Sequence, residues 1–265
     1  MRKLFYLFFI LTVISCNKTQ KPINNEYLDE YRYPADSLIN PKVFVYESND
    51  HLDKLSFFLR LVKIENGSKI CIHVELNKDN NTPRRDSTVF YYRGKNLFLR
   101  DEYTLFKDST TNKDKVIKTE IIDYFESPQK RVIKKKYPSP LNESIVCTSN
   151  EISSFAKKTT FKIFNKDVKC VIMTNEIFIK IKYKYIPFIL KNVQKTGITI
   201  YAKGMGMVYK RTYNKTYKVD YSLKLKEIID YQTYLKKYCK KQSPSPVEQD
   251  MFIINKKMEL PVNGR

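Results

Sequence analysis

Alternation of apolar and polar side chains with a period of two residues is the feature that most constrains how this chain can fold. Successive side chains of a β-strand point to opposite faces, so a period of two marks a strand with two different faces. The segment IFIKIKYKY at 177–185 is the clearest example, because Lys180, Lys182 and Lys184 alternate with Ile and Tyr. Similar segments recur between residues 42 and 228, which predicts a chain built mainly of β-strands.

Tight turns connect the predicted strands in order along the chain. Asn66-Gly67 is typical of a two-residue hairpin turn, and Gly94-Lys95 and Asn165-Lys166-Asp167 are predicted to turn two more hairpins. We therefore predict a single antiparallel meander, which many strands would curl into a half-barrel or open barrel. A segment near 227–241 fits one short C-terminal helix.

Two of the six glycines, Gly204 and Gly206, lie one residue apart. A Gly-x-Gly sequence in a basic chain can cradle a phosphate, but the known loops need further glycines or a lysine ahead of a helix. Here Tyr209 occupies the position of the third glycine, and a β-favouring run follows. We interpret both glycines as structural, at a bend or a close backbone approach within the curved sheet.

The N-terminus has the pattern of an export signal. Arg2 and Lys3 precede a short, mostly apolar run that is too short to cross a bilayer as a helix. The following VISC at 13–16 resembles the bacterial lipobox, which implies cleavage before Cys16 and acylation of its thiol. The predicted parts are a signal peptide at 1–15, a lipidated cysteine and tether at 16–40, a β-domain at 41–241 and a mobile tail at 242–265.

The chain is strongly basic, with 49 Lys and Arg against 28 Asp and Glu. Such a charge attracts polyanions, but the basic residues are spread along the chain rather than gathered in one block. We therefore favour general lysine enrichment over a nucleic-acid site and expect no nucleic-acid partner. The stripe of Lys180, Lys182 and Lys184 is a candidate polyanion site, with a solvated outer face as the favoured alternative.

Residues suited to catalysis or metal binding are scarce. The two histidines are His51 and His73, and no second ligand pair accompanies Cys71 and His73. We predict no metal, no cofactor and no enzymatic activity. Besides Cys16, four cysteines can either form two disulfides or remain free, and we leave both alternatives open. They are Cys71, Cys147, Cys170 and Cys239.

Three Asp-Ser sequences resemble the signal for O-glycosylation in the periplasm of some Gram-negative bacteria. The candidate serines are Ser37, Ser87 and Ser109. Asp-Ser also begins ordinary turns, which is the favoured alternative.

The stretch IYAKGMGMVYKRTYN resembles a motif near the C-terminus of uncharacterised β-rich bacterial lipoproteins, Tyr-x-x-Gly-x-Gly followed by a hydrophobic residue and Val. TTFKIFNKDVKCVIM and DSTVFYYRGKNLFLRDEY resemble upstream strands of these proteins, so the likeness covers roughly residues 85–225. It implies a long antiparallel sheet curled over a hydrophobic cleft, as in the lipoprotein-carrier family of the periplasm, where the cleft takes acyl chains. Met205 and Met207 depart from the commoner Val and Leu.

These observations favour a non-enzymatic lipoprotein, held by acyl chains on Cys16 in the outer membrane and facing the periplasm. Asn17, in place of an Asp after the cysteine, favours the outer over the inner membrane. The expected role is binding of a hydrophobic or amphipathic ligand, or of an envelope protein. The alternatives are a scaffolding component of an outer-membrane assembly and, less favoured, an envelope hydrolase.

Overall fold

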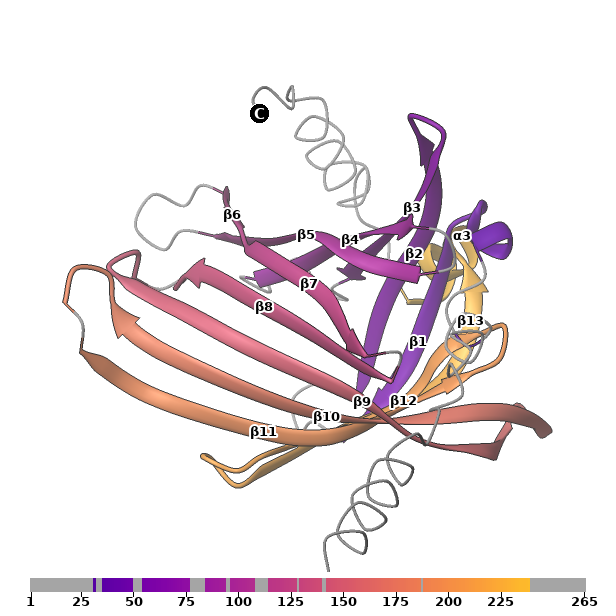
Figure 1. Ribbon diagram of the computed structural model, residues 1–265. Helices are drawn as coiled ribbons and strands as arrows, with labels where there is room; N and C mark the ends of the chain where they lie inside the picture. Colours follow the sequence, from indigo (N-terminus) through magenta and orange to yellow (C-terminus); the bar gives the residue numbers. More distant parts are fainter. Residues whose placement is uncertain are drawn as a thin grey trace, which may run out of the picture.

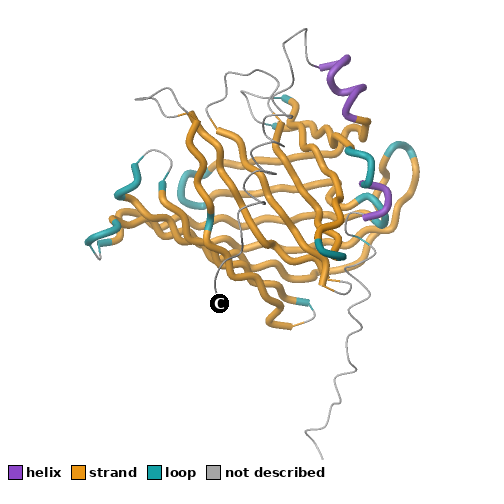
Figure 2. Tube along the Cα trace, turned by 90° about the horizontal axis from the view of Figure 1, so that it is seen from above, coloured by secondary structure: helices purple, strands orange, loops and turns teal. Residues whose placement is uncertain are grey.

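The computed structural model describes residues 31, 35–49, 54–76, 84–93, 96–107, 114–127, 129–139, 142–186 and 188–238. The described part of the chain forms one antiparallel sheet of thirteen strands. The sheet curls into a nearly closed barrel (Figure 1), and the view from above shows strands on both sides of the interior (Figure 2). The predicted fold class is confirmed.

The elements follow one another almost without interruption. A short 3-10 helix η2 (Ala35–Leu38) precedes the strands, and the helix α3 (Tyr231–Tyr238) follows them. The strands are β1 (Lys42–Ser48), β2 (Leu55–Glu65), β3 (Ser68–Leu76), β4 (Arg84–Arg93), β5 (Asn96–Lys107), β6 (Asp114–Lys118), β7 (Glu120–Ser127), β8 (Lys130–Pro138), β9 (Ile145–Ile163), β10 (Lys166–Tyr183), β11 (Ile189–Ala202), β12 (Gly206–Asn214) and β13 (Val219–Asp230).

The sheet order is that of a meander whose two ends pair. β1 lies between β2 and β13, and it is antiparallel to both. The free edges are β6 and β7, which are separated in sequence by Thr119 alone. β6 pairs with β5 and β7 pairs with β8, so these two strands are successive halves of one extended segment. The barrel is therefore open at a single seam, between β5 and β7.

Both faces of β1 and β2 carry buried apolar side chains, which belong to two separate clusters on the outer and the inner side of the sheet. Ile70, Ile72 and Val74 alternate with Cys71 and His73 in β3, as the sequence predicts. The apolar residues of this face belong to one buried cluster that includes Tyr234 of α3. The opposite face of β2 and β3 lines the interior cavity with Phe58, Arg60 and His73, beside the second buried apolar cluster.

Helix α3 covers part of that outer face and is shorter than predicted. The ring of Phe57 lies 5.2 Å from that of Tyr234 and 4.9 Å from that of Tyr238. Residues 227–230 belong to β13, because the ladder with β1 continues to the pair Lys42 and Asp230. The carboxylate of Asp230 then accepts a hydrogen bond from the backbone N–H of Thr233 at 2.8 Å, which is an N-cap.

The hairpin turns are partly as predicted. Asn66 and Gly67 both have positive φ, at 49° and 75°, which confirms the turn. The third predicted turn is wrong by one residue, since Phe164 and Asn165 are the residues with positive φ. Lys166 already pairs with Ile163, so a two-residue loop preserves the ladder that the predicted three-residue loop would shift. Gly94-Lys95 lies outside the described residues.

The two glycines singled out in the sequence close the β11–β12 hairpin. Gly204 and Gly206 have φ of 70° and 81°, a region that glycine occupies without strain. The close backbone approach belongs to a different glycine, Gly197 in β11, where an added Cβ would lie 2.0 Å from the carbonyl oxygen of Arg211.

Replacing Gly204 or Gly197 with alanine should separate the cost of a positive φ from the cost of a close backbone approach. Gly204→Ala should cost about 1–2 kcal/mol of unfolding free energy from its left-handed φ alone. Nothing lies within 4 Å of the added Cβ. Gly197→Ala should cost more, because β11 and β12 must move apart to relieve the overlap. Urea unfolding followed by circular dichroism measures both. A Gly197→Ala chain as stable as the wild type would contradict the close approach.

Candidate functional site

A cavity of about 340 Å³ lies inside the barrel. One part of its wall is apolar and comes from strands on opposite sides, including Phe58, Phe90, Met173 and Met207. Another part is charged or polar, including Arg60, His73, Glu75, Asp86 and Lys210. The lining therefore suits a ligand with both an apolar and a polar part. The resemblance in the sequence implied a hydrophobic cleft, and the observed wall is more polar than that.

Lys210 also lines this wall, and its ammonium group has no ion pair with another described residue. It lies in β12, opposite Thr199 of β11. Burial lowers the pKa of its ammonium group, and the carboxylate of Glu151 opposes this shift while Lys135 adds to it. No side-chain hydrogen bond or ion pair joins the Lys210 ammonium group to another described residue. A desolvated ammonium of this kind is stabilised by any anion that enters the cavity.

Cys71 and His73 form a neutral contact rather than a reactive pair. The Cys71 Sγ lies 3.3 Å from the His73 Nε2, and the imidazole ring also packs 4.8 Å from the ring of Phe90. Burial raises the pKa of the Cys71 thiol to about 12, and the charge of Arg60 only partly offsets this. Burial, reinforced by Arg60, holds the pKa of His73 well below its usual value. An activated cysteine needs the opposite shifts, a depressed thiol pKa beside a protonated imidazole.

Arg60 links three strands at one end of the cavity. Its guanidinium donates a hydrogen bond to the Tyr46 hydroxyl at 3.0 Å and lies 4.0 Å from the centre of the Phe44 ring. The Tyr46 hydroxyl in turn donates to the backbone carbonyl of Met207 at 2.8 Å. These contacts tie β2 to β1 and, past the intervening strand β13, to β12.

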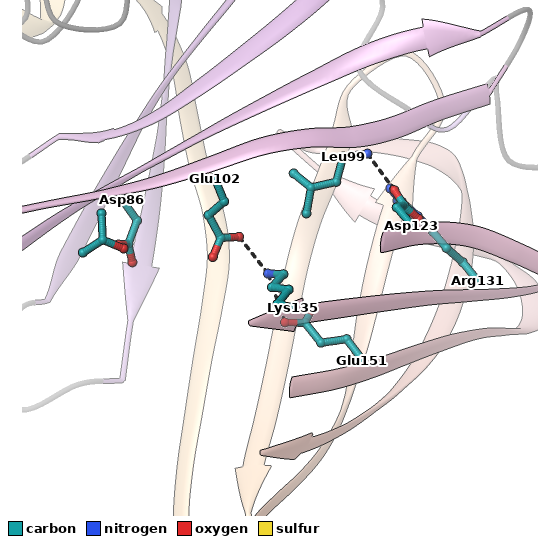
Figure 3. A network of polar contacts seen from close by, with 8 residues as sticks. Asp86, Leu99, Glu102, Asp123, Arg131, Lys135 and Glu151 are labelled. Carbon is teal, nitrogen blue, oxygen red and sulfur yellow. Dashed lines mark hydrogen bonds and ion pairs between the residues drawn. The ribbon is translucent and has the colours of Figure 1, made fainter. Parts of the chain in front are cut away.

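A buried carboxylate bridges the open seam of the barrel. The backbone N–H of Leu99 in β5 donates to the Asp123 Oδ2 of β7 at 2.6 Å (Figure 3). The Arg131 Nε of β8 donates to the Asp123 Oδ1 at 2.9 Å, and a second guanidinium nitrogen contacts the other oxygen. The Asp123 side chain is only 2% exposed. A side chain here takes over the role that a carbonyl plays in a continuous β-ladder.

A second ionic bridge crosses the same seam. The Lys135 Nζ of β8 lies 2.7 Å from a carboxylate oxygen of Glu102 in β5 and 3.0 Å from one of Glu151 in β9 (Figure 3). Burial alone would lower the pKa of Lys135, but the charges of Glu151 and Glu102 outweigh it and raise the pKa. Thr119 completes the seam, since its backbone N–H donates to the Glu102 carbonyl at 2.9 Å.

The residues singled out in the sequence do not gather at this cavity, apart from His73. Lys180, Lys182 and Lys184 are exposed on the outer side of β10 and just beyond its end. Ser37 is exposed in η2, whereas Ser87 is 9% exposed in β4, so that its modification would have to precede folding. Cys16, His51 and Ser109 lie outside the described residues.

The cavity residues were missed in the sequence because they carry no motif. Lys210, Asp123 and Arg131 are charged residues within strand sequences, and each reads as a solvated side chain. Their only signal is the period of two, which places them on one face but does not say that this face lies inside.

The described cysteines and helices add three findings. Cys71, Cys147 and Cys170 form no disulfide with one another. No group of three or more potential metal ligands occurs among the described residues. No helix within the described ranges is long and apolar enough to span a membrane.

Removing the seam carboxylate should destabilise the barrel strongly. Asp123→Ala leaves the Arg131 charge and the Leu99 N–H without their acceptor, which should cost about 3–5 kcal/mol of unfolding free energy. Glu120→Ala is the matched control, because it breaks an exposed pair with Lys136 in the same strands and should cost at most about 1 kcal/mol. Denaturant unfolding of both variants checks this, and equal losses would contradict the bridging role.

Comparisons with known proteins give structural likeness only. No family model matches the chain, and no curated protein matches it. A Parabacteroides distasonis protein described as a lipoprotein has a TM-score of 0.44 and 10% identity, over 75% of this chain and 97% of that one. A Bacteroides fragilis exported protein with a YmcC-like fold has a TM-score of 0.44 and 11% identity, over 71% and 94%. The hypothetical lipoprotein YmcC from Escherichia coli has a TM-score of 0.32 and 16% identity, over 75% and 90%.

Proposed function

We propose that this chain is a lipid-anchored envelope protein that holds a small amphipathic ligand with an anionic group inside its barrel. The observation that supports it is the interior cavity, in which the Lys210 ammonium faces an otherwise partly apolar wall. The role is binding rather than catalysis.

The charges around the cavity support an anionic ligand group. Arg131 is engaged by Asp123, and Lys135 by Glu102 and Glu151. Lys210 has no such contact with a described residue, and its lowered pKa reflects the cost of its burial. A carboxylate or phosphate beside it would offset that cost and would be bound by a charge-assisted hydrogen bond.

The apolar wall supports a short hydrocarbon part. Phe58, Phe90, Met173 and Met207 line the cavity, and methionine side chains adapt to ligands of different shape. A volume of about 340 Å³ is at the lower end of the usual range for ligand pockets. The ligand is therefore one short acyl chain or a molecule of similar size, rather than a lipid with two or three long chains.

The anchor is supported by the sequence alone. The basic start, the short apolar run and VISC at 13–16 form the lipobox pattern, and acylation of Cys16 would hold the barrel at a membrane. We propose the outer membrane and its periplasmic side, in keeping with Asn17.

Lys210→Met tests the ligand, with octanoate and octanol as probes of equal chain length. Octanoate binding to the variant should weaken by about tenfold to a hundredfold, because a hydrogen bond to a charged group contributes about 1.5–3 kcal/mol. Octanol binding should change little. The ligand-free variant should also unfold at a higher temperature, since a desolvated cation has been removed. Isothermal titration and thermal unfolding measure these effects.

Lys166→Met is the matched control, because it removes an exposed lysine at the start of β10. It should leave both titrations unchanged. Equal octanoate binding by Lys210→Met and the wild type would contradict the site. If octanoate binds neither protein and a stable envelope partner is captured at moderate salt, the scaffolding alternative gains instead.

Cys16→Ala tests the anchor. Cells supplied with a fatty-acid analogue should label the wild-type chain, and the variant should carry no label because the acceptor thiol is gone. Cys147→Ala, which removes a cysteine of the barrel, should keep the label. Labelling of Cys16→Ala would show that acylation occurs elsewhere.

A further inference from the structure

The tip of the β10–β11 hairpin exposes large apolar side chains. They come from the strand ends and from the turn between them: Tyr183, Tyr185, Ile186, Phe188, Ile189 and Leu190. We call these six residues the apolar tip. Tyr185 is 81% exposed and Phe188 is 64% exposed, so their rings have little contact with the rest of the protein. A contiguous apolar surface of this kind marks an interaction site.

The tip extends past the neighbouring strand. β11 begins at Ile189, but its ladder with β12 begins only at the pair Lys195 and Asn214. The turn between β12 and β13 lies beside the exposed part of β11, because the Lys191 Nζ sits 4.0 Å from the centre of the Tyr217 ring. Tyr217 and Val219 are themselves exposed, at 51% and 55%, and enlarge the surface.

The charge around the tip is mainly positive. Residues 177–219 contain nine lysines, one arginine and no acidic residue. Lys180, Lys182, Lys184 and Lys191 flank the tip and are exposed. In the sequence, a solvated face is the favoured interpretation of the stripe of Lys180, Lys182 and Lys184. That interpretation does not account for the position of the stripe beside the apolar tip.

We propose that the apolar tip inserts into the interface of an anionic phospholipid leaflet, with the flanking lysines on the lipid phosphates. Tyrosine suits this depth because one end of the ring is apolar and the other polar. The lysines attract anionic headgroups while their hydrocarbon stems lie along the apolar surface. A protein partner would offer no equal reason for both the prevailing positive charge and the exposed apolar tip.

The proposal gives the barrel an orientation. β10 has 18 residues, so its two ends lie about 60 Å apart at roughly 3.3 Å per residue. Figure 1 shows the β10–β11 tip at the left of the barrel and the β9–β10 turn at the right. Docking of the tip therefore leaves Phe164 in the β9–β10 turn away from the membrane, although this residue is also exposed. This orientation does not depend on a ligand in the cavity.

Hydrogen–deuterium exchange of the full chain tests the insertion. The protein is reconstituted into vesicles of phosphatidylcholine alone or with three-tenths phosphatidylglycerol, and exchange of the amides of Tyr185, Ile186 and residues 188–190 is compared. Each lysine near an anionic surface contributes about a fivefold preference, so exchange should slow by at least about tenfold in the anionic vesicles. The turn at Phe164 should exchange equally in both.

Two variants and one control complete the test. Ile186→Ser with Phe188→Ser, and separately Lys182→Gln with Lys184→Gln and Lys191→Gln, should each abolish the slowing. Phe164→Ser should retain it. Equal exchange at the tip in both kinds of vesicle would overturn the proposal, and so would protection that arises only with a bound protein. Fatty-acid labelling of Cys16 is scored on the same samples, so a failed anchor is distinguished from a failed insertion.

Discussion

The barrel depends on one constraint. At the β5–β7 seam, backbone N–H and C=O groups need hydrogen-bond partners although no β-ladder joins the two strands. An edge strand leaves N–H and C=O groups in need of partners, and a buried edge cannot leave them to water. The Asp123 carboxylate accepts from the Leu99 N–H, and Arg131 holds that carboxylate in place. Lys135 joins Glu102 to Glu151 across the same gap. Ionic side chains thus replace the missing rungs and keep the thirteen-stranded sheet closed around an interior.

Closing the seam with charges also determines what the interior is like. Carboxylates and cations that bridge the gap face inward, so the interior carries polar groups beside a buried apolar cluster of its own, while a second apolar cluster packs outside against α3. A cavity built in this way cannot be a purely apolar cleft. Its wall combines aromatic and methionine side chains with Lys210, and this combination is the basis for proposing an amphipathic rather than a purely hydrophobic ligand.

Strand pattern and turn chemistry were predictable to different degrees. Asn66-Gly67 could be identified because the turn needs residues that tolerate positive φ. The turn at Phe164 and Asn165 could not, because pairing of Lys166 with Ile163 places a Phe where the sequence gives no such signal. β8 and the start of β9 show little alternation, since RVIKKKYP and IVCTSNEI mix lysines and polar residues on both faces. Their strand structure rests on the ladders with neighbouring strands, which no local pattern records.

The sequence by itself determined the β-class, the order of most hairpins and the lipobox, because these rest on local periodicity, turn residues and a short motif. It also placed His73 and Cys71 on one face. Only the tertiary structure decided which face is inside, because a period of two distinguishes two faces but does not indicate which of them faces the interior. The same holds for the seam, where Asp123 and Leu99 are 24 residues apart, and for the lysine stripe. The fold places this lysine stripe beside the apolar tip, which the sequence pattern did not indicate.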